Sequence, residues 1–344
     1  MNPAKAYAHL FSPLGREGEE NYRGLAQISF LRSPITELSA KAIKKSGAKY
    51  AFLGVSFDEG VVGKPGTEEA PRELRLASQE YFPYWFEFEV DLEGCAIDCG
   101  DIAPVKVNTK RARKEIYEGV RELLRGGVTP IICGGDRSVS IQAARALADH
   151  IGKKKKMGVL HMGAQLDMAE SWAGQKELST NAMARITEIS NVNAANVAVV
   201  GVRNSMNPKD YIDLAKKRKI GVYPMFDMIE RGIDVCFQEA VDRVWDGTHT
   251  QYLSFNMNCM DASAAPGVTM TEPGGIESRE IMRLVRMIGN KKKVGIIDIT
   301  ENCPLYDIGG TTSRLSVCIV LRLIAAIMAA NGQTVDPKIK RSDL

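Results

Sequence analysis

One stretch of the sequence has the spacing of a metal-binding loop but lacks the charges that such a loop needs. Residues 254–275, SFNMNCMDASAAPGVTMTEPGG, begin as an apolar strand and continue as a loop rich in Asn, Pro and Gly. Asn256 and Asn258 alternate toward one face at the carboxyl end of the strand, where open α/β sheets place their ligands. Two aspartates at this spacing would bridge two cations. Two asparagines offer neutral oxygens but cannot balance two divalent charges.

Three further polar loops follow other predicted strands. They are GGDRS at 134–138, HMGAQLD at 161–167 and DITENCP at 298–304. Because the carboxyl ends of parallel strands meet at one edge of a sheet, we expect these loops and residues 254–275 to converge on one rim. A pocket at this rim is the expected functional site.

The elements that position these loops are short apolar runs that alternate with helical patterns. The predicted strands cover 50–55, 95–98, 129–134, 157–162, 196–202, 220–224, 251–256 and 294–300. Apolar residues recur at helical spacing over 110–125, 138–150, 210–218, 277–288 and 312–330. This order indicates an α/β fold, a three-layer αβα sandwich around a mainly parallel eight-stranded sheet. We expect one domain over residues 46–335, after an arm at 1–45 and before a tail at 336–344.

The composition argues against several kinds of partner. Lys and Arg total 45 against 42 Asp and Glu, which gives no large positive field for nucleic acid. The longest apolar run, Leu315–Ala330, contains Arg322 and is shorter than the ~20 residues of a membrane span, so we interpret it as a core helix. Seven scattered cysteines indicate unpaired thiols of a reducing compartment. Because no segment of signal-peptide type opens the sequence, we expect a cytoplasmic location.

The polar loops resemble, in order, the motifs GGDHS, HxDAHxD, SFDxDxxDPxxAPGTGTPEPGG and DxxExxP of the ureohydrolase family, which includes arginases and agmatinases. GVSFDEGVVGKPGTEEAPRELR at 54–75 is similar to a further family motif, and RGLAQISFLRSPI at 23–35 is similar to the segment that opens agmatinase-type members. The resemblance covers nearly the whole chain and implies an arginase-type fold. It also implies that active members hold two divalent metals with two histidines and four aspartates, and use a metal-activated water to attack a guanidinium carbon.

By this resemblance, one ligand position of six keeps its family residue. The six positions are occupied here by Arg137, Gly163, Gln165, Asp167, Asn256 and Asn258. Arginine stays protonated, glycine has no side chain and amides carry no charge, so we expect no metal and no catalytic residue in this chain. A buried Asp167 needs a positive partner, and we predict an ion pair with Arg137 that fills the vacated site. The alternative is that both side chains face solvent.

Other residues have two interpretations each. Glu301 matches the family carboxylate that contacts the substrate guanidinium, and residual guanidinium binding or a local cap or ion pair are equally open. The family's SHG substrate loop is Ser179–Asn181 here, without the histidine. His161 is a candidate ligand or base, although its place inside a strand favours a core histidine. Cys259 lies near the expected pocket without a histidine beside it in sequence, and is a weak candidate nucleophile.

A family-type fold that lacks most of the family's metal ligands is compatible with several functions. We favour a non-catalytic subunit that joins a paralogous ureohydrolase chain in a trimer or hexamer, where the partner carries a Mn or Ni pair. By resemblance, the substrate of the complex is metformin or another biguanide, guanidine or an agmatine-like compound. The family includes metformin hydrolase, a nickel-dependent hetero-oligomer of metal-bearing and metal-free chains, and this sequence resembles the metal-free kind. The alternatives are a metal-free guanidine- or amine-binding regulatory protein, an enzyme with new chemistry in the same pocket, and a stand-alone agmatinase-like amidinohydrolase.

Overall fold

A single parallel sheet forms the middle of the molecule. The computed structural model describes residues 28–104, 108–291 and 294–334. Eight strands pair in the order β4-β1-β5-β10-β9-β6-β7-β8, and every pairing in this sheet is parallel. They are β1 (Tyr50–Val55), β4 (Ala96–Ile102), β5 (Thr129–Gly134), β6 (Met157–Met162), β7 (Val192–Val202), β8 (Gly221–Pro224), β9 (Thr250–Asn256) and β10 (Val294–Thr300). The predicted eight-stranded sheet is confirmed.

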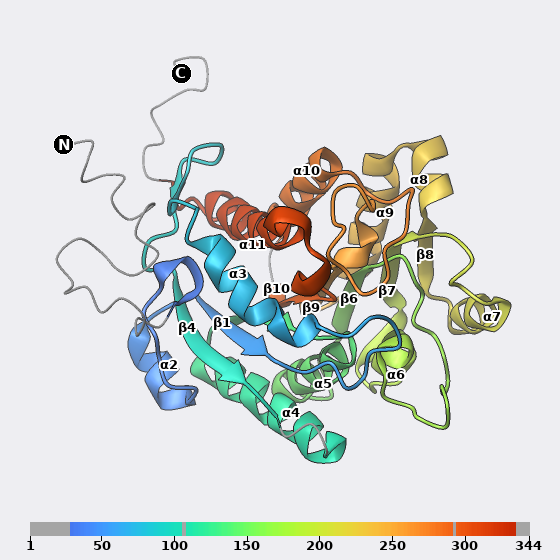
Figure 1. Ribbon diagram of the computed structural model, residues 1–344, viewed down its shortest axis with the longest axis horizontal. Coiled ribbons are helices and arrows are strands. Elements are labelled where there is room, and N and C mark those ends of the chain that lie inside the picture. Colours follow the sequence, from blue (N-terminus) through green and yellow to red (C-terminus); the bar gives the residue numbers. More distant parts are fainter. Residues whose placement is uncertain (1–27, 105–107, 292–293, 335–344) are drawn as a thin grey trace.

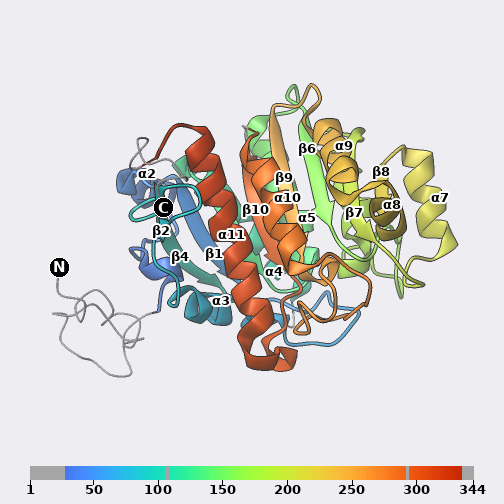
Figure 2. The same ribbon diagram turned by 90° about the horizontal axis from the view of Figure 1, so that it is seen from above.

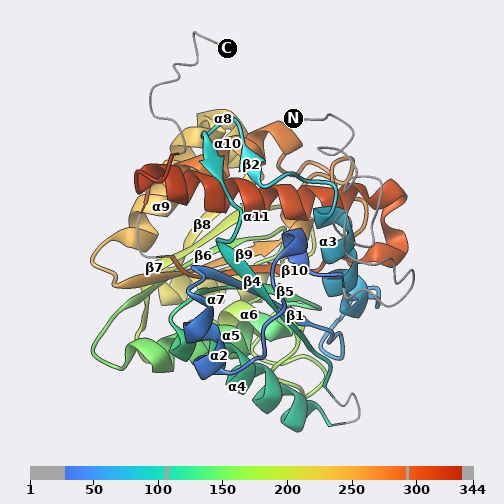
Figure 3. The ribbon, with the colours of Figure 1, turned by 90° about the vertical axis from the view of Figure 1, so that its left-hand side faces the viewer.

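Helices cover both faces of the sheet, as Figures 1 and 3 show. One face carries α3 (Ala70–Ser78), α8 (Met225–Arg231), α9 (Ile233–Trp245), α10 (Ser278–Gly289) and α11 (Thr311–Ala330). The other carries α2 (Ala40–Ser46), α4 (Thr109–Gly126), α5 (Ser138–Ile151), α6 (Ala182–Ile186) and α7 (Lys209–Arg218). A two-stranded antiparallel hairpin, β2 (Tyr84–Trp85) and β3 (Val90–Asp91), lies outside the main sheet. The three-layer αβα arrangement is therefore confirmed.

Each face of the sheet has its own hydrophobic core. Side chains alternate along a strand, so in β9 Leu253 and Phe255 join the core under α10 and α11. Tyr252, the residue before Leu253, joins the core under α4 and α5. Burial on both faces explains why the strands read as continuous apolar runs.

The helix α11 contains the longest apolar run of the chain. By length and composition alone, residues 308–330 would be able to cross a bilayer, but most of this stretch is buried inside the fold. It packs against α10 and α3 (Figure 2). The helix ends before Asn331 and Gly332, whose φ of 74° is favourable for glycine. The interpretation as a core helix is confirmed.

The part of the predicted arm that the structure describes packs against the edge of the sheet. Phe30 stacks on Phe52 of β1 with ring centroids 4.6 Å apart, and its backbone N–H donates to Asp98 over 2.7 Å. Arg75 of α3 holds the same carboxylate through Nε at 2.7 Å and Nη2 at 2.9 Å. Residues 1–27 of the arm and the tail predicted at 336–344 lie outside the described residues.

Candidate functional site

The four polar loops meet at the carboxyl ends of four adjacent strands. β5, β10, β9 and β6 are neighbours in the middle of the sheet. The loops that leave them carry the predicted site residues, which the fold brings together. These side chains are buried, with residue exposures of 3% for Arg137, 4% for Gln165, 1% for Asp167, 0% for Asn256, 1% for Asn258 and 1% for Glu301. The site is therefore a packed polar cluster.

The guanidinium of Arg137 lies at the centre of this cluster. Its Nη1 is 2.6 Å from Oδ2 of Asp167, so the predicted ion pair is confirmed. Its Nε is 3.6 Å from Oε1 of Glu301, and its backbone N–H donates to the same oxygen over 3.0 Å. One cation is thus held between two buried carboxylates that come from two different strands.

Both carboxylates that face Arg137 sit on unusual backbone. Asp167 has a φ of 52° and Glu301 a φ of 66°, in the left-handed region that residues other than glycine seldom adopt. Such conformations persist where the surroundings hold them, and they cluster at functional sites. The backbone at these two positions therefore has a conformation that is common at functional sites, and the side chain of Arg137 lies between them.

Neutral amides fill the side of the cluster next to β6 and β9. Nη1 of Arg137 donates to Oε1 of Gln165 over 3.5 Å, and Nδ2 of Asn258 donates to the same oxygen. Oδ1 of Asn258 accepts the backbone N–H of Ala164 over 3.1 Å. The backbone N–H of Asn258 donates to Oδ1 of Asn256 over 3.0 Å. The amides therefore bond to one another and to nearby backbone.

His161 occupies the space beside Gly163. A Cβ at Gly163 would lie 2.7 Å from Nε2 of His161, so any side chain there would displace the imidazole. The other ring nitrogen, Nδ1, lies 3.1 Å from the hydroxyl of Ser254, and Nε2 lies 3.5 Å from Oδ2 of Asp167. His161 is a buried histidine, in agreement with the favoured interpretation, but the sequence did not predict its contact with Asp167.

Glu301 is saturated by contacts within the chain. Besides Arg137, its carboxylate accepts the hydroxyl of Thr269 at Oε2. Thr269 belongs to the loop at 254–275, so this bond joins the ends of β9 and β10. Of the two interpretations left open for Glu301, the local ion pair and hydrogen bond are present in the structure. Thr269 was missed because nothing in its sequence context marks it as a partner of Glu301.

Two further buried acids extend the cluster. Burial, reinforced by the negative charge of Glu301, raises the pKa of Asp136 to about 7. Burial also raises the pKa of Asp298, although the hydroxyls of Ser140 and Tyr252 both donate to it. Burial therefore disfavours the charged form of both acids. Arg137 is thus the main counter-charge of the cluster.

The weaker sequence candidates have structural roles. Burial raises the pKa of Cys259 to about 12, so this thiol is not a reactive thiolate at neutral pH. Asn181 is buried, donates to the carbonyl of Ala169 over 2.7 Å and accepts the N–H of Leu178 over 3.0 Å. The loop at 179–181 is held by these bonds.

Arg203 holds the loop at 254–275 in place, a role that the sequence did not predict. Its buried guanidinium donates to carbonyls at both ends of the loop, including Asn258 over 3.0 Å, Met260 over 3.0 Å and Pro273 over 2.9 Å. Burial lowers the pKa of Arg203. Because its partners are backbone atoms far away in sequence, only the fold reveals them.

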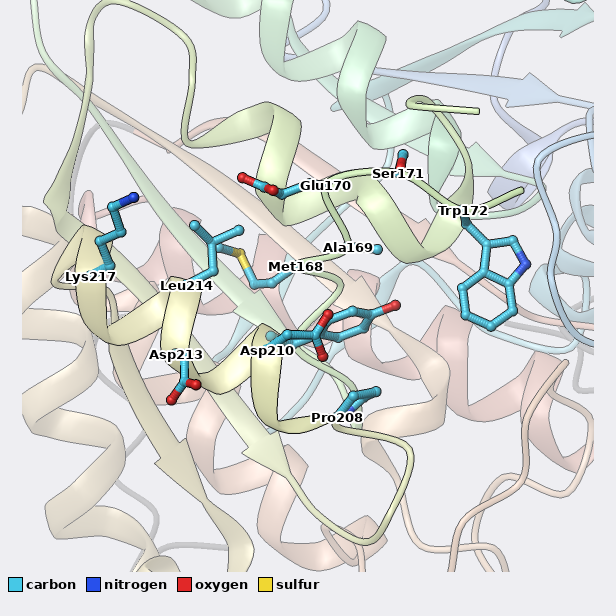
Figure 4. A pocket seen from close by; sticks show the side chains of 11 residues that line it. Met168, Ala169, Glu170, Ser171, Trp172, Pro208, Asp210, Asp213, Leu214 and Lys217 are labelled. Atoms are coloured by element: carbon cyan, nitrogen blue, oxygen red, sulfur yellow. The ribbon is translucent and has the colours of Figure 1, made fainter. Parts of the chain in front are cut away.

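A surface hollow lies beside the cluster and is separate from it. It measures about 730 Å³ and is bounded by α7 and by the segment that follows Asp167. Figure 4 shows Glu170, Asp210 and Asp213 around it, with Trp172 at one end and Lys217 at the other. The lining includes none of the predicted site residues, so this hollow is not the pocket expected where the four polar loops converge.

The fold agrees with comparisons to known proteins. A model of the arginase family matches residues 48–326. The chain belongs to the arginase family. Enzymes of this family hydrolyse carbon–nitrogen bonds in linear amidines.

Several relatives within the arginase family match almost the whole chain. Guanidinobutyrase from Pseudomonas aeruginosa is 26% identical over 322 residues, which cover 93% of this chain and 97% of that protein. The structure of proclavaminate amidinohydrolase from Streptomyces clavuligerus has a TM-score of 0.76 at 24% identity, covering 88% of this chain and 98% of that one. Formiminoglutamase from Trypanosoma cruzi, solved with two Mn²⁺ ions, has a TM-score of 0.75 at 18% identity and covers 84% and 98%. These two structures share the fold of this chain.

We predict that Asp261 stabilises the loop at 254–275 in a pH-dependent way. Its carboxylate accepts bonds from Ser263, Gly274 and Gly275, and these bonds, led by the Ser263 hydroxyl, lower its pKa to about 2. A lowered pKa contributes stability that is present above the unfolded value near 4 and is lost as the pH falls toward 2. Asp261→Asn should lower the free energy of unfolding by about 1–2 kcal/mol at pH 6, after allowance for solvent screening.

Urea denaturation of both proteins between pH 2 and 7 measures this difference. The gap between Asp261→Asn and the unmodified chain should close as the pH approaches 2. The matched control is Asp213→Asn, which removes an exposed ion pair with Lys209 and should cost less than about 1 kcal/mol. A gap that stays constant over the whole pH range would refute the role given to Asp261.

Proposed function

We propose that this chain is a non-catalytic subunit of a hetero-oligomeric arginase-family hydrolase. In this proposal a paralogous chain binds the two metals and catalyses the reaction, and this chain is a structural subunit of the same oligomer. The observation that carries the proposal is the guanidinium of Arg137 between Asp167 and Glu301. The proposal assigns no catalytic residue to this chain.

The donor set does not fit a pair of divalent metals. Two such ions need several anionic or imidazole ligands to balance their charge. In the described ranges, no group of three or more His, Cys, Asp and Glu side chains is placed to hold a metal ion. The carboxylate that remains, Asp167, already lies 2.6 Å from a cation that cannot lose its proton. A metal would have to displace Arg137 and its positive charge, so we derive no metal-dependent step for this chain.

Energetics favour an arginine at this position in a site without metals. A carboxylate in a dry site is costly unless a cation and hydrogen bonds compensate it. Here Arg137 supplies the cation, while Gln165 and Asn258 supply neutral partners for one another. The cluster therefore substitutes for the metals as the element that holds the strand ends together.

The alternatives receive less support from the same contacts. A guanidine-binding regulatory protein would need a free carboxylate, but both oxygens of Glu301 have partners within the chain. A stand-alone agmatinase-like enzyme, or an enzyme with new chemistry, would need an activated nucleophile. Cys259, the one thiol considered for this role, has a pKa raised to about 12 by burial.

The remaining parts of the proposal rest on resemblance. The assembly would be a trimer or hexamer in which the partner carries a Mn or Ni pair, as in the metformin hydrolase type of hetero-oligomer. Its substrate would be metformin or another biguanide, guanidine or an agmatine-like compound. We place the complex in the cytoplasm, where its seven free cysteines would remain reduced.

The first test compares the lone chain with the assembly. The full chain, purified alone from cells supplied with Mn and Ni, should release no urea or ammonia from guanidine, agmatine, 4-guanidinobutyrate or metformin. The tagged chain isolated from its own cells should carry a second arginase-family chain with His and Asp at the six ligand positions, and this complex should turn over one of the substrates. Turnover by the lone chain, or a tagged chain without any such partner, would rule out the proposal.

A second prediction concerns the space that Arg137 fills. Arg137→Ala leaves Asp167 and Glu301 without their cation, which should lower the free energy of unfolding by about 3–5 kcal/mol. Because the vacated space is lined by carboxylates, guanidinium at low millimolar concentration should raise the melting temperature of the variant and leave that of the unmodified chain unchanged. Differential scanning calorimetry measures both.

Sodium chloride at the same ionic strength is the control for salt effects. Arg72→Ala is the matched control for the loss of an arginine, because Arg72 is exposed and its ion pair is with the neighbouring Glu73. An Arg137→Ala variant as stable as the unmodified chain would show that Arg137 does not hold the cluster together.

A further inference from the structure

The short helix α8 is apolar on both of its sides. Met225 and Met228 are buried in the core beneath it. Phe226 and Ile229, three residues apart and therefore on one face, are 63% and 73% exposed. Charged residues of the same helix border this face, and an exposed apolar patch rimmed by polar residues is typical of an interaction surface. The outer face of α8 therefore has the composition of a covered surface.

A hollow of about 500 Å³ lies directly beside this exposed face. Phe226 forms one of its walls. The other apolar walls come from α7, β8 and the segments next to them, and include Ile212, Ile220, Val222 and Pro224. Figures 1 and 2 place α7 and α8 at the end of the molecule next to β8, the edge strand of the sheet. An apolar ridge and an apolar hollow are thus adjacent on one exposed end.

Two opposite charges border the same hollow. Lys216 comes from α7 and Asp227 from α8, and both line it. The side chains of Lys216 and Asp227 make no ion pair with each other or with any other residue of the described ranges. The α8 surface is defined here by Ile212, Lys216, Phe226, Asp227 and Ile229.

A two-fold contact uses the same surface on both copies, so it requires a surface that is complementary to itself. The α8 surface has this property, because it carries a ridge, a hollow next to it, and one charge of each sign. We infer that the α8 surface is a two-fold interface between two copies of this chain. In it the Phe226 and Ile229 ridge of each copy enters the hollow of the other, and Lys216 of each copy faces Asp227 of the other.

This interface does not depend on the loss of catalysis, since none of its residues belongs to the Arg137 cluster. An apolar small molecule would fill the hollow but would leave Ile229 exposed. A paralogous partner at this surface would leave the lone chain monomeric. With either of these occupants the purified chain would have the mass of a monomer, whereas a two-fold contact predicts a dimer.

Sedimentation equilibrium on the full chain tests the inference. The unmodified chain at tens of micromolar should contain dimers or even-numbered assemblies. Ile229→Glu should weaken the two-fold association at least tenfold without disrupting the fold of the single copy, because the side chain is exposed there. The matched control on the same helix is Glu230→Gln, which should leave the mass unchanged. A monomeric unmodified chain, or an Ile229→Glu variant of unchanged mass, overturns the inference.

A charge exchange separates a specific interface from general apolar association. Lys216→Asp places like charges opposite one another across the two-fold contact and should weaken association. The double variant Lys216→Asp with Asp227→Lys restores opposite charges and should regain most of the lost affinity. A double variant that associates no more tightly than Lys216→Asp alone contradicts the proposed pairing.

Discussion

The contact on which the site depends is the guanidinium of Arg137 held between Asp167 and Glu301. It joins the ends of β5, β6 and β10 at the place where buried acids would otherwise repel one another. Burial, and then the negative charge of Glu301, raise the pKa of the neighbouring Asp136. A single permanent cation therefore determines which side chains can occupy this end of the sheet.

The loops around Arg137 are held by contacts that need no metal. Arg203 ties both ends of the loop at 254–275 through backbone carbonyls, and Asp261 closes the same loop through Ser263 and two glycine N–H groups. Thr269 then joins this loop to Glu301. These bonds involve none of Arg137, Gln165 and Asp167, so the loop is held independently of the central ion pair.

Much of the fold and part of the site follow from the sequence. The strands were predictable because burial on both faces leaves continuous apolar runs, and the pairing of Arg137 with Asp167 followed from the need of a buried carboxylate for a cation. The ends of two strands were not predictable, because they extend beyond the apolar runs. β7 begins at Val192, four residues before the predicted start, and β4 continues to Ile102. The contacts of Thr269 and Arg203 join residues far apart in sequence, so no local pattern encodes them.

Anomalous diffraction from crystals of the chain grown with millimolar Mn²⁺ tests the central claim most directly. The account predicts no manganese peak at Asp167, with the guanidinium of Arg137 within ion-pair distance of Asp167 and close to Glu301. One or two manganese ions coordinated by Asp167, with Arg137 displaced from the cluster, would contradict it.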